Sequence, residues 1–278
     1  MTLSEMRRIL AAGDIQLTKS LGQNFLHDQN QLQKIVASAE LIPTDKVLEI
    51  GPGLGPLTEL LIANAGDVLA IEMDQRLVDF LREKYSAVKN FKLIHDDALS
   101  FLRRERSDWF EWKLVANLPY SVASPILVEL AEAEGSPRKI VTTLQMEVAE
   151  RIVAKAGEDD YGILSLLVQL RYEPHGGFKI PGSCFFPAPD VDSACIVLNR
   201  RPVPLLSTED SRPFKKIVKR AFSQRRKMML KLLKQDWPKE KLESAFTELK
   251  ISPQERAEQV SLEQFVALTI LLNKTETH

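Results

Sequence analysis

The segment Asn117-Leu118-Pro119-Tyr120 carries residue types suited to a reaction at an aromatic amino group. Such an amino group is a poor nucleophile because its lone pair is delocalised into the ring. The Asn117 side-chain oxygen and a backbone carbonyl held by Pro119 could accept its two N–H bonds and favour a tetrahedral nitrogen. Tyr120 could then stack on the base. Asn-Pro segments are also common structural turns, so the position of this one in the fold decides its meaning.

A glycine-rich turn, Gly51 to Gly55, follows the apolar run Val47 to Ile50 and precedes apolar residues at helical spacing. This order is typical of a strand, a tight turn and a helix, and an open α/β sheet binds ligands beyond such a strand end. A dinucleotide-binding turn needs a small residue where this chain has Pro56, so a pyrophosphate cradle is disfavoured. Glu72 ends the next apolar run at a distance that suits a carboxylate accepting from both ribose hydroxyls. The sequence therefore predicts a site for an adenosine-containing ligand without phosphates.

Two further features could complete this site. Asp97 follows the predicted strand 91–95 and could accept from an adenine amino group, although an isolated Asp there is also typical of a helix N-cap. Phe185 and Phe186 begin a proline-stiffened segment that ends at Ser193. A second aromatic ring from this segment could sandwich an extruded base, while at least one of the two phenylalanines is expected to pack in the core.

The elements that must position these residues follow from hydrophobic periodicity. Five short apolar runs alternate with segments of helical spacing: 47–50, 68–71, 91–95, 113–116 and 139–144. Strands that alternate with helices favour an α/β fold with a doubly wound parallel sheet and right-handed crossovers. After residue 144 the pattern predicts two helices, 147–155 and 161–171, and one more strand at 194–198.

The last quarter of the chain has a different character. Pro202 and Pro204 predict a linker, and the three segments beyond it have helical spacing: 214–233, 239–249 and 262–272. We therefore expect a Rossmann-like catalytic domain over residues 1–203 and a small helical domain over residues 204–278.

Charge is distributed unevenly between these two parts. The chain has 278 residues, 44% of them hydrophobic, and a formal net charge of -1, which excludes a disordered chain. Residues 201–278 hold 16 Lys and Arg against 10 Asp and Glu, whereas residues 1–200 hold 21 against 28. Between Arg212 and Lys234 there are ten basic residues and no acidic one. A solvated helix face usually mixes both signs, so this segment predicts a nucleic-acid-binding surface.

Cysteine, histidine and hydropathy patterns limit the remaining classes. Two cysteines without a Cys-x-x-Cys motif and four scattered histidines make a metal site or a disulfide framework improbable. No run of eighteen apolar residues and no leader-like segment occurs, so we expect a soluble, cytoplasmic protein that does not bind membranes. A monomer is the default expectation.

Seven segments together resemble the bacterial ribosomal RNA adenine N6,N6-dimethyltransferase family. They occur in one order between Gly22 and Lys227: Gly22-Gln23-Asn24-Phe25-Leu26, 49–55, 117–120, 145–151, 161–165, 185–193 and 221–227. The resemblance implies a class I methyltransferase sheet and S-adenosylmethionine as methyl donor. It also implies dimethylation of two adjacent adenosines in the 3'-terminal hairpin loop of small-subunit (16S) rRNA, in a pre-30S or 30S particle, and a role in small-subunit biogenesis.

The same resemblance assigns roles to individual residues. The methyl-donor site would comprise Asn24, Leu26, Gly51, Glu72, Asp97 and Asn117. The residues around the reacting amino group would be Asn117, Leu118, Pro119, Tyr120 and Phe185. The basic segment between Arg212 and Lys234, rather than the resemblance alone, supplies the expected RNA-binding residues Arg220, Arg225, Arg226 and Lys227, and no metal is expected. The chain departs from the family pattern after Lys227, where it has 228–233 (Met-Met-Leu-Lys-Leu-Leu), so the RNA contacts of the helical domain are left open.

Four alternative functions are compatible with parts of the same sequence pattern. An adenine methyltransferase acting on DNA, or an enzyme that methylates a protein amide, would use a similar turn, but Leu118 and the segment 185–193 favour RNA. A non-catalytic small-subunit assembly factor that retains the methyltransferase fold is disfavoured by the intact donor site. A nucleotide-dependent dehydrogenase is disfavoured by Pro56 and by Asn117 to Tyr120.

Overall fold

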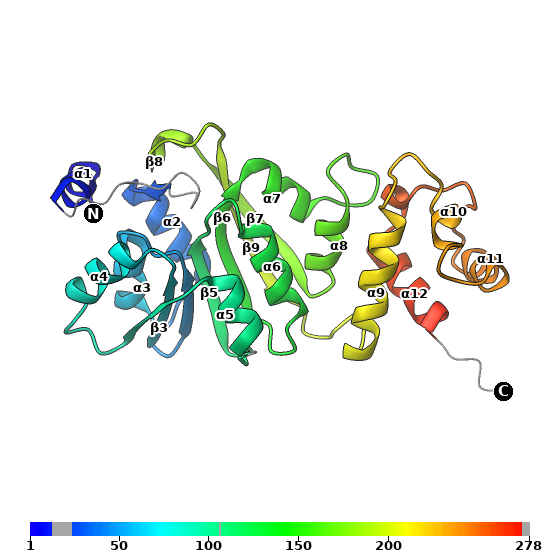
Figure 1. Cartoon of the computed structure of the whole chain (residues 1–278), viewed down its shortest axis with the longest axis horizontal. Helices are drawn as coiled ribbons and strands as arrows, with labels where there is room; N and C mark the ends of the chain where they lie inside the picture. Colours follow the sequence, from blue (N-terminus) through cyan, green and yellow to red (C-terminus); the bar gives the residue numbers. More distant parts are fainter. Residues whose placement is uncertain (13–23, 106, 274–278) are drawn as a thin grey trace. The chain divides into compact units, whose positions relative to one another are not determined.

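A computed structural model describes residues 1–12, 24–105 and 107–273 (Figure 1). Packing divides the chain into two units: a sheet unit of Met1–Ala149 and Glu173–Arg200, and a helical unit of Glu150–Tyr172 and Arg201–His278. The helical unit thus includes Glu150–Tyr172 as well as the C-terminal residues, whereas the sequence predicted a single division between residues 203 and 204. The assignment of separate functions to residues 1–203 and 204–278 stays a prediction.

The sheet unit is built on one seven-stranded sheet. Its order is β4 (Phe91–His95), β3 (Asp67–Glu72), β2 (Lys46–Ile50), β5 (Trp112–Asn117), β6 (Lys139–Gln145), β9 (Ser193–Arg200) and β7 (Tyr172–Ile180). The first five strands are parallel, and β9 is antiparallel to β6. The five strands predicted between residues 47 and 144 and the strand predicted at 194–198 are confirmed, and the sheet is mixed rather than wholly parallel.

Strand β7 was not predicted, and its composition explains why. It contains Pro174, Gly176 and Gly177, residues that are typical of turns and that weaken a strand interior. β7 lies at the edge of the sheet, where a proline does not break a ladder on both sides.

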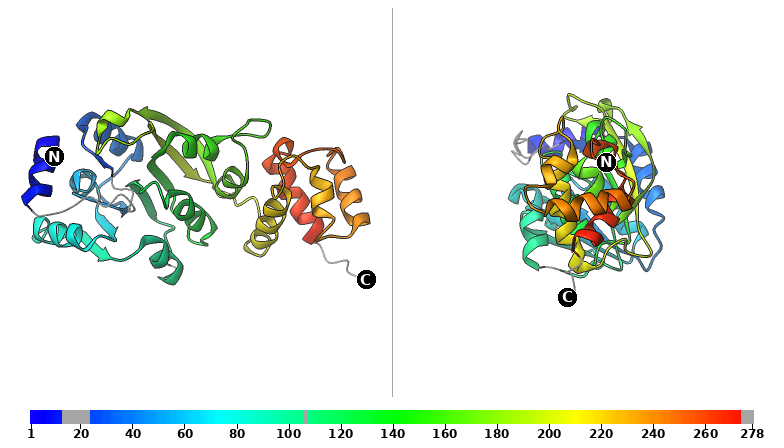
Figure 2. Two further views of the ribbon diagram at one scale, coloured as in Figure 1. Left: turned by 45° about the horizontal axis from the view of Figure 1, so that its top comes forward. Right: turned by 90° about the vertical axis from the view of Figure 1, so that its right-hand side faces the viewer.

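Helices cover the sheet and bury both of its faces (Figures 1 and 2). The sheet unit contains α1 (Leu3–Ala12), α2 (Gln29–Ala39), α3 (Pro56–Asn64), α4 (Gln75–Lys84), α5 (Ala98–Glu105) and α6 (Ala123–Glu132). On one face, Val47, Val115 and Val141 pack in a cluster with residues of α2 and α3. Their strand neighbours Leu48 and Ile140 point to the other face and are also fully buried. Burial on both faces explains the nearly continuous apolar runs of these strands.

A short two-stranded ribbon joins distant parts of the chain. β1 (Phe25–Leu26) pairs antiparallel with β8 (Phe185–Phe186), so that Phe25 lies opposite Phe186 and Leu26 opposite Phe185. Phe25 belongs to the family-like segment 22–26, and Phe186 belongs to the segment 185–193. Gly22 and Gln23, which begin the first of these motifs, lie outside the described residues.

The helical unit contains α8 (Ile163–Gln169), α9 (Thr208–Ala221), α10 (Met229–Leu233), α11 (Lys239–Glu248) and α12 (Leu262–Asn273), and α7 (Met146–Val153) leads into it. α9 buries Phe214, Ile217, Val218 and Ala221 on one face, and α12 packs against it. The helix predicted over 214–233 is two helices, since the polar stretch after Ala221 interrupts it before α10. No helix among the described residues has the length and apolar character needed to cross a membrane.

A buried carboxyl group connects strand β2 to the helix that follows it. Glu49 of β2 is 1% exposed, and the Thr58 hydroxyl of α3 donates to its Oε2 at 2.7 Å. Burial, with the neighbouring Glu72 as a smaller contribution, raises the pKa of Glu49 from 4.5 to about 8. The folded protein therefore retains a proton on Glu49 over a pH range in which the unfolded chain has lost it.

This proton makes stability depend on pH in a defined direction. Between pH 4.5 and about 8 the folded state binds the proton and the unfolded state does not, so the free energy of unfolding falls as the pH rises. Glu49→Gln removes the titration and keeps an oxygen acceptor for Thr58. We expect denaturant titrations from about pH 5 to about pH 9 to show the variant gaining roughly 1–3 kcal/mol relative to the wild type. Glu59→Gln on the exposed side of α3 is the control, and a pH-independent difference for Glu49→Gln would contradict the assignment.

Candidate functional site

A cavity of about 270 Å³ lies beyond the carboxyl ends of β2, β3, β4 and β5. Five of the six residues predicted for the methyl-donor site line it: Asn24, Gly51, Glu72, Asp97 and Asn117. Leu118, Pro119 and Tyr120 line it as well. Parallel strands end at the same edge of a sheet, which brings side chains from four separate loops to one place.

The glycine turn forms one wall of the cavity and is confined from two sides. Gly51 and Gly53 have φ angles of +69° and +61°, a region that side chains disfavour. A Cβ atom on Gly53 would lie 2.5 Å from the ring of Phe25, and one on Gly51 would lie 3.2 Å from Cγ of Pro119. Glycine is required at these positions so that Phe25 and Pro119 can approach the turn.

Glu72 is held in position by backbone groups at the end of β3. Its Oε1 accepts from the N–H groups of Met73 and Asp74 at 2.9 and 3.0 Å, and its Oε2 accepts from Gly53 at 3.1 Å. Glu72 is 7% exposed, and burial raises the pKa of its carboxyl group above the ordinary value. A carboxylate has about four acceptor positions, so one remains, on Oε2. Contact with both ribose hydroxyls would therefore require a shared, three-centre hydrogen bond.

Asp97 combines the two roles that its position allowed. Its Oδ1 accepts from the N–H of Ser100 at 2.7 Å at the start of α5, as an N-cap does. Asp97 also lines the cavity beside Asp96 and Glu72. No Lys or Arg is among the described residues that line the cavity, so its charged groups are all acidic.

Asn117 has its side-chain amide bound on both sides. Its Nδ2 donates to the backbone carbonyl of Asn24 at 2.9 Å, and its Oδ1 accepts from the Thr143 hydroxyl. Thr143 is the β6 partner of Asn117 in the parallel ladder and is fully buried. These contacts fix the orientation of the amide and leave one lone pair on Oδ1 for a further donor.

Tyr120 is anchored at the other end of the same segment. Its hydroxyl lies 2.5 Å from Oγ of Ser193, the last residue of the segment that begins at Phe185. Burial raises the pKa of Tyr120 above its ordinary value, so the hydroxyl stays protonated and available for this contact. The turn between Asn117 and Tyr120 is therefore held by hydrogen bonds to three other segments.

Leu26 and Phe185 are not among the cavity-lining residues. The two side chains are 1% and 2% exposed, and they lie in the hydrophobic core on one side of the β1–β8 ribbon. Leu26 can reach a ligand only through its backbone, and the ring of Phe185 does not face the cavity. Phe186 is the less buried of the pair, and the guanidinium of Arg7 lies 5.2 Å from its ring centroid. Alternation along a strand places the two rings on opposite sides, and the expectation of one core phenylalanine is met by Phe185.

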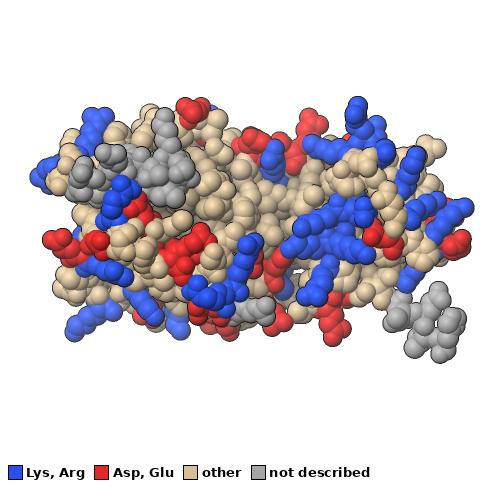
Figure 3. Space-filling view, in the orientation of Figure 1, with Lys and Arg blue, Asp and Glu red and all other residues tan. Residues whose placement is uncertain are grey.

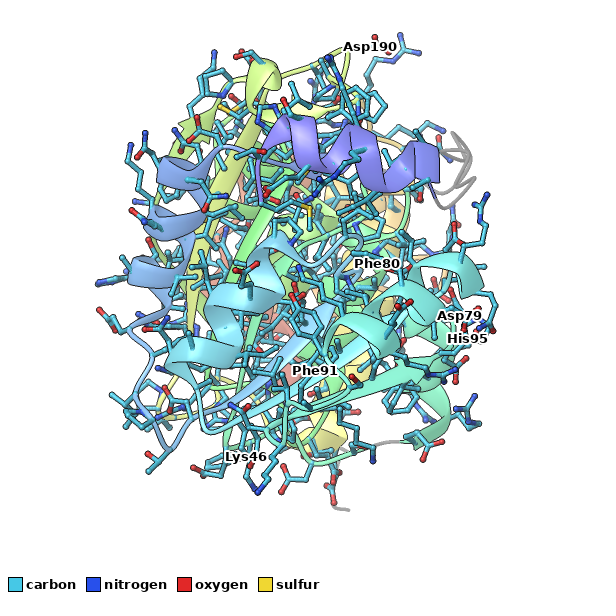
Figure 4. All side chains as sticks on the ribbon, turned by 90° about the vertical axis from the view of Figure 1, so that its left-hand side faces the viewer. Lys46, Asp79, Phe80, Phe91, His95 and Asp190 are labelled. Atoms are coloured by element: carbon cyan, nitrogen blue, oxygen red, sulfur yellow. The ribbon has the colours of Figure 1, made fainter. Side chains whose placement is uncertain are left out.

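Helix α1 packs against residues that line the cavity, a contact that no sequence motif indicated. Met6 and Leu10 pack in one cluster with Phe25, Leu54 and Leu77, and both Phe25 and Leu77 line the cavity. In Figure 4, α1 runs across the top of the sheet unit and the labelled Phe80 of α4, which packs against the same cluster, lies below it. The spacing of Met6 and Leu10 could indicate an amphipathic helix, but not the surface that it covers.

The four predicted RNA-binding residues differ in how they are held. The Arg220 guanidinium contacts Asp236 and donates to Gln235 at 3.0 Å, and Arg225 donates to the carbonyl of Asp159 at 2.8 Å. Arg226 and Lys227 are exposed on the turn that follows α9. Asp236 follows the acid-free stretch 212–234 in the sequence, and its carboxylate pairs with Arg220 of that stretch.

No group of three or more His, Cys, Asp or Glu in the described part of the chain is arranged to hold a metal ion. Cys184 and Cys195 are both free thiols.

The strand order and the cavity beyond its strands define a class I methyltransferase. The structure is similar to that of the 23S rRNA methyltransferase ErmE, with a TM-score of 0.70, 29% identity and coverage of 90% of this chain and 100% of that one. It shares its fold with a dimethyladenosine transferase from Plasmodium falciparum, with a TM-score of 0.75, 24% identity and coverage of 88% and 95%.

Sequence comparison defines the family within this class. The model of the ribosomal RNA adenine dimethylase family matches residues 15–274. Two proteins named Ribosomal RNA small subunit methyltransferase A, from Geobacillus sp. (strain WCH70) and Ligilactobacillus salivarius (strain UCC118), are each 40% identical to the chain over 278 residues. These matches cover 96% of this chain, and 96% and 94% of the two relatives. The chain belongs to the ribosomal RNA adenine dimethylase family, which confirms the resemblance of the seven segments, and membership implies S-adenosylmethionine as methyl donor.

The hydrogen bond from Thr143 generates a test of how Asn117 is oriented. Thr143→Val removes the hydroxyl and keeps the shape, so that Asn117 Oδ1 loses its buried donor and the amide can turn. We expect kcat for methyl transfer to small ribosomal subunits to fall about 10- to 100-fold. Thr142→Val is the matched control, because the Thr142 hydroxyl donates to the Ala116 carbonyl at 3.0 Å and does not contact Asn117. Equal kcat values for the two variants would refute the orienting role.

Proposed function

We propose that this protein transfers methyl groups from S-adenosylmethionine to N6 of two adjacent adenosines in the 3'-terminal hairpin loop of small-subunit (16S) rRNA. Each adenosine would be methylated twice, in a pre-30S or 30S particle in the cytoplasm, and the enzyme would act as a monomer with a role in small-subunit biogenesis. The observation that carries the proposal is the fixed amide of Asn117, whose Oδ1 keeps one free lone pair at the cavity.

The charge of the cavity supports this methyl donor. Its charged lining residues are Glu72, Asp96 and Asp97, with no cation among the described ones, which suits a positively charged ligand and opposes one with phosphates. S-adenosylmethionine supplies a sulfonium-bound methyl group, and the sulfur takes the bonding electron pair when that methyl is transferred. Glu72 would accept from the ribose, and Asp97 from the adenine amino group through the carboxylate oxygen that Ser100 does not occupy.

The acceptor amine would be oriented by Asn117 and by the backbone of the turn. Asn117 Oδ1 would accept one N6–H bond. The second acceptor would be the backbone carbonyl of Leu118, which the ring of Pro119 holds, while the Pro119 carbonyl accepts from the N–H of Val122 at 3.1 Å within the turn. Two acceptors draw the nitrogen lone pair out of conjugation with the ring, after which the new N–C bond forms and the surplus proton leaves to water. Tyr120 would stack on the base, and catalysis would consist mainly of orientation and electrostatics.

The RNA would be bound through its phosphates by the helical unit. Arg226 and Lys227 are exposed, and Arg225 keeps part of its guanidinium outside its contact with Asp159. Arg220 would act through its contact with Asp236, as a residue that positions others.

The direct test is transfer of labelled methyl from S-adenosylmethionine to small ribosomal subunits that lack the modification, followed by nucleoside analysis. We expect dimethyladenosine from the wild type. Asn117→Ala should lower the rate about a thousandfold or more while it leaves particle binding intact. Equal loss of rate and of particle binding in this variant would refute the role of Asn117. Binding of the wild type without any transfer would favour the alternative of a non-catalytic assembly factor.

Glu72 allows a separate test of donor binding. Glu72→Gln removes the charge at the ribose position, so calorimetry should show about 10- to 100-fold weaker binding of S-adenosylmethionine. Because the pKa of Glu72 is raised, the wild-type affinity should fall with decreasing pH and begin to do so above pH 4.5, whereas the variant should lack this dependence. Glu83→Gln, an exposed change on α4, is the control. Undiminished affinity in Glu72→Gln would exclude the ribose contact.

A further inference from the structure

A groove of about 430 Å³ runs along α9 in the helical unit. It is lined by five cations, Arg212, Lys215, Lys216, Lys219 and Arg220, together with Ser223 and a single carboxylate, Asp236. Figure 3 shows Lys and Arg side chains gathered over the helix that Figure 1 labels α9. All five cations lie in the acid-free segment between Arg212 and Lys234, for which a nucleic-acid-binding surface is predicted, and only Arg220 is among the four residues named individually as RNA-binding.

The groove follows from the periodicity of α9. Its cations form three successive groups, Arg212, then Lys215 and Lys216, then Lys219 and Arg220, spaced three or four residues apart, and so lie along one side of the helix. The other side holds the buried residues Phe214, Ile217, Val218 and Ala221, which fix the rotation of the helix in the unit. From Arg212 to Lys219 the rise along the axis is about 10 Å, so the row of charges extends over two turns.

The cations of the groove fall into two sets. Lys216 lies 3.4 Å from Asp236 and 4.9 Å from the ring centroid of Trp237, and Arg220 contacts Asp236 and Gln235. These contacts lower the pKa of Asp236, which therefore stays ionised and holds both side chains in place. Arg212 and Lys219 are exposed and take part in no ion pair among the described residues. With five cations against one carboxylate, the groove keeps an excess of positive charge.

We propose that this groove binds the phosphodiester backbone of ribosomal RNA, as a site separate from the turn that carries Arg225, Arg226 and Lys227. The proposal rests on the proposed function and adds a second contact region to it. Lysine ammonium groups along a ridge bind phosphates without reading bases, and folded RNA is recognised largely by its shape and phosphates. Lys216 and Arg220 are held in the groove by Asp236, and Arg212 and Lys219 supply the uncompensated charge.

The test compares two double variants that remove the same charge. Arg212→Ala/Lys219→Ala takes two cations from the groove, and Lys239→Ala/Lys250→Ala takes two exposed cations from the start of α11 and from the turn that follows it, both outside the segment between Arg212 and Lys234. Binding to small ribosomal subunits that lack the modification is measured over a series of salt concentrations. For the groove variant we expect about tenfold weaker binding and a decrease of about 2 in the slope of log affinity against log salt. The control variant should stay within about twofold of the wild type.

Two results would overturn the proposal: equal affinity and slope in the groove variant and the wild type, or equal losses in both double variants, which would indicate net charge alone. Calorimetry with S-adenosylmethionine checks folding, since neither variant touches the donor cavity. Failure of the proposed function has a different signature, because the wild type would then bind the particle and yield no dimethyladenosine.

Discussion

The amide of Asn117 is held between the Asn24 carbonyl and the Thr143 hydroxyl, and the rest of the site depends on this pair of hydrogen bonds. A side-chain amide offers two donors and two lone pairs, and a free one would turn between orientations. Here one partner comes from the chain before β1 and the other from the neighbouring strand β6. The ribbon of β1 and β8 and the ladder of β5 and β6 must both form before the acceptor oxygen has a defined direction.

The same pattern of support extends around the cavity. Tyr120 is tied to Ser193, Glu72 is bound by three backbone N–H groups, and Phe25 is pressed against Gly53. The contacts Tyr120–Ser193, Glu72–Gly53 and Phe25–Gly53 join segments that are far apart in the chain, whereas Met73 and Asp74 bind Glu72 from adjacent positions. Burial raises the pKa values of Glu49 and Glu72, but only Glu72 lines the cavity. Together with Asp96 and Asp97 it gives the described lining an acidic character that suits a cationic ligand.

The near-neutral total charge conceals two opposite local fields. The cavity of the sheet unit has only acidic charged residues among its described lining, whereas the α9 groove has five cations and one acid. An acidic cavity attracts a sulfonium and a basic groove attracts phosphates, so the two ligands of the reaction are separated by the sign of the charge. Composition alone averages these fields to a net charge of -1.

Local sequence patterns predict much of the sheet and several residues of the site. The parallel strands, the glycine turn, Glu72 and the Asn117 segment follow from periodicity and from residue type, because each is encoded within a few neighbouring residues. Strand β7 was not predicted because Pro174 and the two glycines that follow it disfavour a strand locally. Pairing at the edge of the sheet overrides that local preference. Packing between distant segments determines three further features of the structure. Phe185 rather than Phe186 is buried, the Thr143 hydroxyl orients Asn117, and Asp236 pairs with Arg220. Such contacts leave no periodic signal in the chain, since they depend on the register of β1 with β8 and on which side of α9 is buried.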